Sequence, residues 1–353
     1  MSFLNNIAGI VCSQKKIWID IGNFETKRLN GDLQPLKNPI FITGFARSGT
    51  TILLEMIASH NDIATHTYRD FPMLFAPYYW NKALGFLDKL SIPQKIKERS
   101  HNDRIMVSPK SPEAMEEILW TAFFDFLHDS KKSNIIDNTY KNPQFANFYI
   151  EHIQKLLLVK KKSTYATKNN YNISRIAYIK KLFPDAKILI MVRHPLNHIY
   201  SCIKQDKLFN REHIKNPSTL AYMNLTGHFE FGTNKKPINI GDTAETTKIC
   251  QFFEQGNFID GWITYWNHIY EYVHNNYSKD ESVKIIRYED ICNNNLSVLD
   301  DIFRFCLIDK YLDITQKYTQ KLSLPNYYTL DLKENEIEQI IIKTKKTAQL
   351  FGY

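Results

Sequence analysis

Glycine, cysteine and long hydrophobic runs are all scarce in this sequence of 353 residues. Glycine accounts for 12 residues, roughly half the frequency usual in proteins, which excludes a collagen-like chain. Five scattered cysteines without a C-x-x-C pair predict neither a disulfide framework nor a zinc site. No run approaches the ~18 apolar residues of a membrane span, and no basic stretch precedes the apolar start as in a signal peptide. These absences predict a soluble, cytoplasmic protein.

The composition is that of a globular protein with a moderate basic excess. Hydrophobic residues make up 43% and charged residues 23%, and 45 Lys and Arg against 37 Asp and Glu give a net charge of +8. This excess either favours an anionic partner or serves only solubility. The sequence contains no stripe of basic residues interleaved with aromatic residues, the pattern that would indicate nucleic-acid binding. The lysine-rich residues 160–162 and 343–346 are either solvated or contact an anionic lipid surface or a charged glycan.

Short apolar runs alternate with longer helical patterns, which predicts an α/β fold with a mostly parallel central sheet flanked by helices. The expected strands are residues 39–43, 164–167, 187–192 and 283–287. The expected helices are residues 50–59, 112–128, 145–160, 173–183, 262–274 and 334–350. We expect a single domain over residues 1–353. Residues 206–257 are polar with weak periodicity and form either an insertion that acts as a lid or binding segment, or a passive surface excursion.

Residues 44–51, GFARSGTT, lie between a predicted strand and a predicted helix. Backbone N–H groups and the positive end of a helix favour an anion at such a junction. Gly44 and Gly49 permit a tight turn, and Arg47 adds a cation. The pattern differs from the Walker A loop, because Thr50 stands where that loop has lysine. The loop therefore suits a phosphate-like group without a demand for Mg²⁺, and the alternative is a turn that binds nothing.

A second strand–helix junction repeats this arrangement. The strand at residues 187–192 ends at Arg193, and Ser201 follows eight residues later, about two turns into the next helix. Because parallel strands present their carboxyl ends at one sheet edge, both junctions are expected to share a crevice. Arg193 and Ser201 could there hold a second phosphate. Lys168, at the end of another predicted strand, could reach the same crevice or be a surface charge.

Together these elements resemble the sulfotransferase superfamily. Residues 44–51 look like its 5′-phosphosulfate loop, residues 193–201 like its 3′-phosphate segment, and residues 286–290, IRYED, like its third recurrent element. The last four residues, LFGY, resemble a common family ending. The resemblance implies a P-loop-like fold. Arg47 replaces a lysine of the cytosolic small-molecule branch, so the chain resembles the tyrosylprotein, carbohydrate and bacterial branches more closely.

The resemblance also implies a donor, an acceptor and a set of site residues. The donor would be 3′-phosphoadenosine 5′-phosphosulfate (PAPS), without a metal, and the acceptor a hydroxyl, which we expect on a carbohydrate or glycolipid. Carried over by motif, Arg47, Ser48, Gly49, Thr50 and Thr51 would bind the 5′-phosphosulfate, Arg193 and Ser201 the 3′-phosphate, and Tyr288 the adenine. Arg47 and Lys168 would stabilise the charge that develops during transfer.

The general base is the least determined part of the predicted site. Tyrosylprotein enzymes place a glutamate shortly after the phosphate-loop helix, but residues 64–72 contain none. The candidates there are Asp70 and His66; alternatively, Asp70 pairs with Arg69 and His66 faces solvent. Glu113 and Glu116 are weaker candidates, because acidic residues near the start of a helix are also favoured there by the helix dipole, without any catalytic role. Two other functions stay open: a nucleotide kinase or NTPase using the same loop, and a non-catalytic nucleotide-binding protein.

Overall fold

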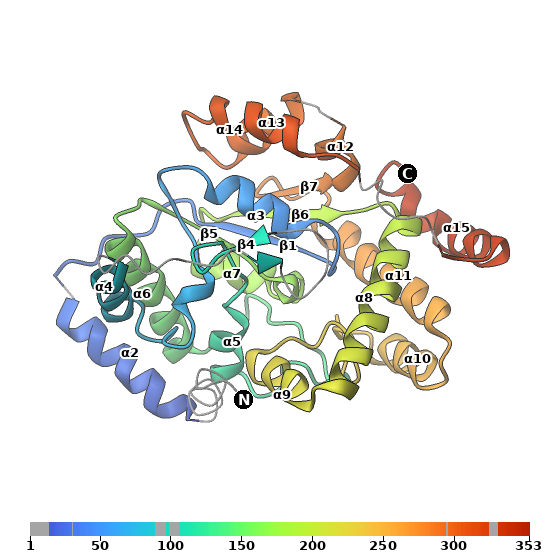
Figure 1. Ribbon diagram of the computed structural model, residues 1–353, viewed down its shortest axis with the longest axis horizontal. Helices are drawn as coiled ribbons and strands as arrows, with labels where there is room; N and C mark the ends of the chain where they lie inside the picture. Colours follow the sequence, from blue (N-terminus) through green and yellow to red (C-terminus); the bar gives the residue numbers. More distant parts are fainter. Residues whose placement is uncertain (1–13, 30, 89–96, 99–105, 294–295, 325–330) are drawn as a thin grey trace.

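A parallel sheet forms the centre of the molecule (Figure 1). The computed structural model describes residues 14–29, 31–88, 97–98, 106–293, 296–324 and 331–353. Within them, five parallel strands lie in the order β2 (Ile63–Ala64), β5 (Thr164–Lys168), β1 (Ile40–Gly44), β6 (Lys187–Val192) and β7 (Val283–Arg287). A short antiparallel pair, β3 (Lys97–Glu98) and β4 (Met106–Val107), lies apart from this sheet. The predicted strands and the α/β class are confirmed.

Helices cover both faces of the sheet, because its central strands are apolar on both sides. Phe41 of β1 packs into one hydrophobic cluster with α6 (Pro143–Lys160), α7 (Ile176–Leu182), α8 (Pro195–Lys215) and α11 (Phe258–Tyr277). Its neighbours Ile40 and Ile42 point the other way, into a cluster with α3 (Thr50–Ala58), α13 (Leu296–Phe305) and α14 (Leu312–Lys321). The sheet is therefore the middle of three layers.

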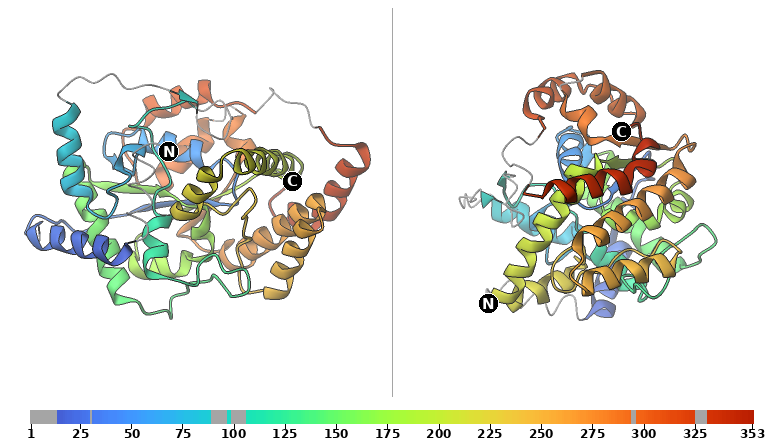
Figure 2. Two further views of the ribbon diagram at one scale, coloured as in Figure 1. Left: turned by 60° about the horizontal axis from the view of Figure 1, so that its bottom comes forward. Right: turned by 90° about the vertical axis from the view of Figure 1, so that its right-hand side faces the viewer.

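The remaining helices surround these layers. They are α2 (Lys15–Leu29), α4 (Pro77–Asp88), α5 (Glu117–Phe123), α9 (Pro217–Thr226), α10 (Thr243–Glu254), α12 (Tyr288–Cys292) and α15 (Glu334–Gln349), with 3₁₀ turns η1 (Tyr68–Asp70) and η2 (Asn170–Ser174). Helix α15 packs along α8 and α11 (Figure 2). No helix in the described part of the chain is both long and apolar enough to cross a membrane. The four described cysteines carry free thiols, and Cys12 lies outside the described residues.

The helix predicted at residues 112–128 is wrong at both ends, since α5 spans Glu117–Phe123. The proline at the start of that prediction forms a β-bridge with Thr67. The Glu113 N–H donates to the carbonyl of His66 at 3.0 Å, so this stretch runs beside an earlier part of the chain. Beyond α5 the backbone is extended at Phe124. Tertiary pairing thus overrides the helical pattern there.

The segment 206–257 is mostly helical despite its weak periodicity. Helix α8 continues to Lys215, and a proline at the first turn of α9 starts the next helix. Helix α9 ends at Gly227, whose φ of +80° provides a left-handed cap. Residues 227–242 then run as a loop to α10. A Cβ at Gly227 would lie 2.6 Å from Cγ of Glu117, so the start of this loop packs directly on α5.

Candidate active site

A cavity of about 420 Å³ lies at the carboxyl ends of the central strands. Arg47 follows β1, Lys168 ends β5, Arg193 follows β6 and Tyr288 follows β7, and all four side chains line the cavity. The structure thereby brings most of the predicted site residues together in one place. The lining includes Arg47, Gly49, Thr50, Thr51, Lys168, Arg193, Ser201 and Tyr288. The volume lies within the range of ligand pockets in proteins.

Residues 44–51, called the phosphate loop from here on, include three residues with positive φ: Gly44 (+147°), Arg47 (+75°) and Gly49 (+103°). A Cβ at Gly44 would lie 2.6 Å from the carbonyl oxygen of Met191 in the neighbouring strand, so glycine is required for this close approach. Helix α3 begins directly after the loop at Thr50. Its N-terminal N–H groups and dipole thus face the cavity side of the sheet, where an anion would be stabilised.

The two predicted anion sites form one connected cluster. The Arg47 Nε–H donates to Oγ of Ser201 at 3.3 Å, across 154 residues of sequence. Arg193 donates from Nη1 to the carbonyl oxygen of Arg47 at 3.2 Å, and its guanidinium lies 4.8 Å from the centre of the Tyr288 ring. The ring in turn covers Gly49, where a Cβ would lie 2.4 Å from it. Two cations, a hydroxyl and an aromatic face therefore share one wall of the cavity.

On the expectation from the sequence that this loop binds the donor nucleotide, replacing Gly49 with alanine should weaken binding of adenosine 3′,5′-bisphosphate by tenfold or more. The new Cβ would collide with the Tyr288 ring and would require a strained left-handed backbone, at a cost of roughly 1–3 kcal/mol. Isothermal titration of the nucleotide measures the change. Gly85→Ala is the matched control, because a Cβ there meets nothing within 4 Å and the position lies in α4. Equal affinity of the Gly49→Ala variant and wild type would contradict this geometry.

Ser48 is buried and its side chain does not line the cavity. Its Oγ lies against Gly44, 2.8 Å from where a Cβ would stand, and its N–H donates to the carbonyl of Phe45 at 3.1 Å. Ser48 therefore supports the loop from behind.

Asp70 is buried in an ion pair away from the cavity lining. It accepts hydrogen bonds from Nζ of Lys160 at 2.9 Å, from the Thr67 N–H at 2.7 Å and from Asn81 at 2.9 Å. Burial acts to raise the pKa of Asp70, but Lys160 and further partners lower it on balance, which keeps the carboxylate ionised. The sequence left open a pair with Arg69; the partner is Lys160, so Asp70 has a structural role here.

His66 is also buried rather than exposed to solvent or to the cavity. Its Nε2 lies 2.9 Å from Nε2 of His152, and the hydroxyl of Tyr165 lies 3.1 Å from its Nδ1. Burial lowers the pKa of His66 to about 4, so the ring is neutral at neutral pH. Because an acceptor molecule cannot reach this ring through the cavity, neither His66 nor Asp70 enters the function proposed below.

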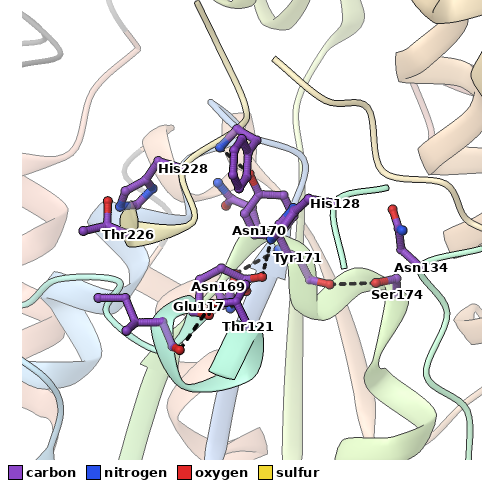
Figure 3. Close-up of polar contacts among 12 residues, drawn as sticks. Glu117, Thr121, His128, Asn134, Asn169, Asn170, Tyr171, Ser174, Thr226 and His228 are labelled. Carbon is purple, nitrogen blue, oxygen red and sulfur yellow. Dashed lines mark hydrogen bonds and ion pairs between the residues drawn. The ribbon is translucent and has the colours of Figure 1, made fainter. Parts of the chain in front are cut away.

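A buried polar network holds the turn that carries Lys168 (Figure 3). Arg175 donates two hydrogen bonds to Glu117, each 2.8 Å long, and His128 adds a third contact at 2.6 Å. Burial acts to raise the pKa of Glu117, but Arg175 above all, together with His128, lowers it far below its usual range. Glu117 also accepts from the side chain of Asn169, which directly follows Lys168, at 2.8 Å. The network therefore fixes the end of β5.

Part of the cavity wall comes from residues that no motif in the sequence marks. His228 and Glu230, from the loop after α9, line the cavity together with Glu113. Glu113 was one of the weaker candidates for the base and lies in a loop, not in a helix. Nothing in the weakly periodic segment 206–257 distinguished one histidine and one glutamate from their neighbours. Among the described residues, no group of three His, Cys, Asp or Glu is placed to hold a metal ion.

The chain belongs to the sulfotransferase family, whose sequence model matches residues 39–227, more than half of the chain. This match starts at the strand before the phosphate loop and includes Lys168 and Arg193. No curated protein matches the sequence.

Similar solved structures are also sulfotransferases. The STF1 enzyme of Mycobacterium tuberculosis is 14% identical, with a TM-score of 0.46 over 92% of this chain and 80% of that chain. The STF9 enzyme of Mycobacterium avium is 13% identical, with a TM-score of 0.45 over 89% of this chain and 77% of that chain. The sulfotransferase domain from the curacin biosynthetic pathway is 15% identical, with a TM-score of 0.35 over 88% of this chain and 99% of that chain.

Proposed function

We propose that this chain transfers a sulfuryl group from PAPS to a hydroxyl of a carbohydrate or glycolipid. The observation that carries the proposal is the convergence of Arg47, Lys168 and Arg193, each at the end of its own strand, on one cavity. Three cations and several hydroxyls fit a donor with two separate anionic groups. Membership of the sulfotransferase family favours PAPS over other nucleotides.

The proposed roles divide the residues between the two anionic groups of the donor, the 5′-phosphosulfate and the 3′-phosphate. Arg47, Gly49, Thr50 and Thr51 would hold the 5′-phosphosulfate at the start of α3. Arg193 and Ser201 would hold the 3′-phosphate, and Tyr288 would lie against the adenine. Ser48 would keep the loop in shape without contacting the donor through its side chain. Each group would be bound by residues from a different strand end, so the sheet sets the spacing between the two anionic positions.

Catalysis would rest on positioning and electrostatics, as in phosphoryl transfer. The acceptor oxygen would form a bond to sulfur while the bond from sulfur to the bridging phosphate oxygen breaks. Arg47 and Lys168 would stabilise the negative charge that grows on the bridging and sulfuryl oxygens. The Arg47 side chain is held by Ser201, and the backbone that carries Lys168 is fixed by the bond of Glu117 to the next residue, Asn169.

The apolar part of the cavity lining suits an acceptor with apolar as well as hydroxyl groups. Its walls are largely aromatic and aliphatic, and they come from η1, from the start of α5 and from α8 and α9. The side chains concerned are Tyr68, Met115, Ile118, Phe209, Tyr222 and Met223. Aromatic faces stack on sugar rings, and aliphatic walls accommodate an alkyl chain. These features support a carbohydrate or glycolipid as the acceptor.

Nucleotide binding separates this proposal from the kinase and NTPase alternative. Adenosine 3′,5′-bisphosphate is expected to bind at least tenfold more tightly than 5′-AMP, because Arg193 and Ser201 add charge-assisted hydrogen bonds to the 3′-phosphate. Arg193→Ala should remove most of that difference in an isothermal titration. Equal binding of the two nucleotides, or Mg²⁺-dependent turnover of ATP, would contradict the proposed donor.

A further inference from the structure

A histidine and a glutamate on the loop after α9 line the cavity, and the roles proposed above leave both unused. Nδ1 of His228 lies 3.7 Å from Oε2 of Glu230, an ion-pair distance. Both side chains share the cavity lining with Lys168 (Figure 3 shows His228 beside Thr226). A titratable ring at ion-pair distance from a carboxylate, in the same cavity wall as a cation assigned to the transferring group, brings together the groups that a proton transfer needs.

We propose that His228 is the general base that takes the proton of the acceptor hydroxyl, with Glu230 holding its ring. This inference rests on the proposed function, and it replaces the two bases that the sequence suggested. A carboxylate beside Nδ1 keeps the proton on that nitrogen and leaves the lone pair of Nε2 to accept another.

The backbone on either side of the ring is fixed. The His228 N–H donates to the carbonyl of Met223 at 2.9 Å, which continues the hydrogen bonding of α9 past its glycine cap. The next N–H, of Phe229, donates to the hydroxyl of Tyr171 at 2.8 Å. Hydrogen bonds thus join the loop both to α9 and to η2, and they fix the backbone at His228.

Glu230 is tied to the phosphate loop through Asn170. Its Oε1 accepts from Nδ2 of Asn170 at 3.2 Å, and Oδ1 of Asn170 accepts from the hydroxyl of Thr50 at 3.3 Å. The backbone carbonyl of Asn170 also accepts from Thr43 of β1, at 3.2 Å. One chain of contacts therefore runs from the start of α3, where the donor would bind, to the carboxylate that orients the base.

The charges around His228 come from three elements. Glu230 lies on its own loop, Glu113 on the loop before α5, and Lys168 at the end of β5. Burial acts to lower the pKa of His228, but Glu230 and Glu113 more than offset burial and Lys168, so the net shift is upward from 6.5. His228, followed by Lys168, holds the pKa of Glu230 at about 2 against the opposing effect of burial. Glu230 thus stays ionised, and the pKa of His228 lies above its ordinary value of 6.5, so the ring is a stronger proton acceptor than an unperturbed histidine.

The proposed step balances in atoms and electrons. As the acceptor oxygen forms its bond to sulfur, its proton moves to Nε2 of His228. The bond from sulfur to the bridging oxygen breaks, and its electron pair leaves on adenosine 3′,5′-bisphosphate beside Lys168. The products are a sulfate ester, the bisphosphate and a protonated imidazole, which returns its proton to solvent.

Turnover of the His228→Gln variant tests the assignment. The assay uses ³⁵S-labelled PAPS with a panel of free sugars and alkyl glycosides, including octyl β-D-glucoside. We expect kcat to fall by about 10²–10⁴-fold, the usual contribution of a general base, while the KM for PAPS and the affinity for adenosine 3′,5′-bisphosphate stay within threefold. Glu113→Gln tests the rival carboxylate and should cost less than tenfold. His274→Gln, outside the cavity lining, is the matched control.

The pH dependence of kcat supplies a readout that a purely structural role would not move. Because the base must be neutral, the rate should rise with pH through an apparent pKa above 6.5 in wild type. Glu230→Gln removes the carboxylate that raises this pKa, so the rising limb should move to lower pH, and His228→Gln should abolish it. Retention of turnover within fivefold by His228→Gln, or an unmoved limb in Glu230→Gln, overturns the inference alone. A wild-type protein that transfers no sulfuryl group overturns both it and the proposed function.

Discussion

Replacing Arg47 with alanine is expected to lower the turnover number for sulfuryl transfer by about 10²–10³-fold, the usual effect of removing one preorganised donor to a developing negative charge. Arg47 occupies a strained position, with a φ of +75°, inside the loop between β1 and α3. Its contact with Ser201 fixes the guanidinium on the cavity wall before any ligand binds. The transfer of ³⁵S from labelled PAPS to acceptors measures the loss.

Two further variants show whether the geometry of the guanidinium matters. Arg47→Lys keeps the positive charge but loses the planar fork, so it should recover only part of the activity. Arg211→Ala removes an exposed arginine of α8 that does not line the cavity, and it should leave turnover unchanged. Activity of Arg47→Ala within threefold of wild type would contradict the assignment of the phosphate loop.

Arg175→Met is expected to destabilise the protein by roughly 3–5 kcal/mol, the usual cost of leaving a buried carboxylate without its partner. Arg175 is 1% exposed, and its guanidinium donates two hydrogen bonds to Glu117. The guanidinium also lies 4.8 Å from the centre of the Trp120 ring, so packing is lost together with charge. Chemical denaturation followed by circular dichroism measures the free energy of unfolding.

A double variant separates the unpaired charge from the lost packing. Glu117→Gln combined with Arg175→Met removes both charges and should destabilise the protein less than Arg175→Met alone. Loss of the network should also reduce turnover, because Glu117 holds Asn169 directly after Lys168. A cost below about 1 kcal/mol for Arg175→Met would show that the buried pair does not support the end of β5 as described.

Local patterns in the sequence predict the strands and the phosphate loop well. The run at residues 188–192 is apolar throughout, as a strand buried on both faces must be, and together with Lys187 it forms β6 with the predicted bounds. Arg47, Arg193 and Ser201 could be placed together because parallel strands present their carboxyl ends at one edge. Their contacts at 3.2–3.3 Å follow from that topology.

The base could not be predicted in the same way, because burial is decided by residues far along the chain. His66 and Asp70 lie close in sequence to the phosphate loop. Yet His152 and Lys160 of α6, 86 and 90 residues away, enclose them in the interior. His228 reaches the cavity only through the path of α9 and the loop after it, for which the sequence carries no periodic signal. Distance from a motif along the chain is therefore a poor guide to the acceptor side of this site.

Sulfuryl transfer itself is measured by incubating the wild-type protein with ³⁵S-labelled PAPS and a mixture of sugars, alkyl glycosides and glycolipids, without added metal. We expect a labelled sulfate ester and an equal amount of adenosine 3′,5′-bisphosphate, both lost in Arg47→Ala. Tight binding of the bisphosphate without label in any acceptor would contradict a transferase and favour a nucleotide-binding role.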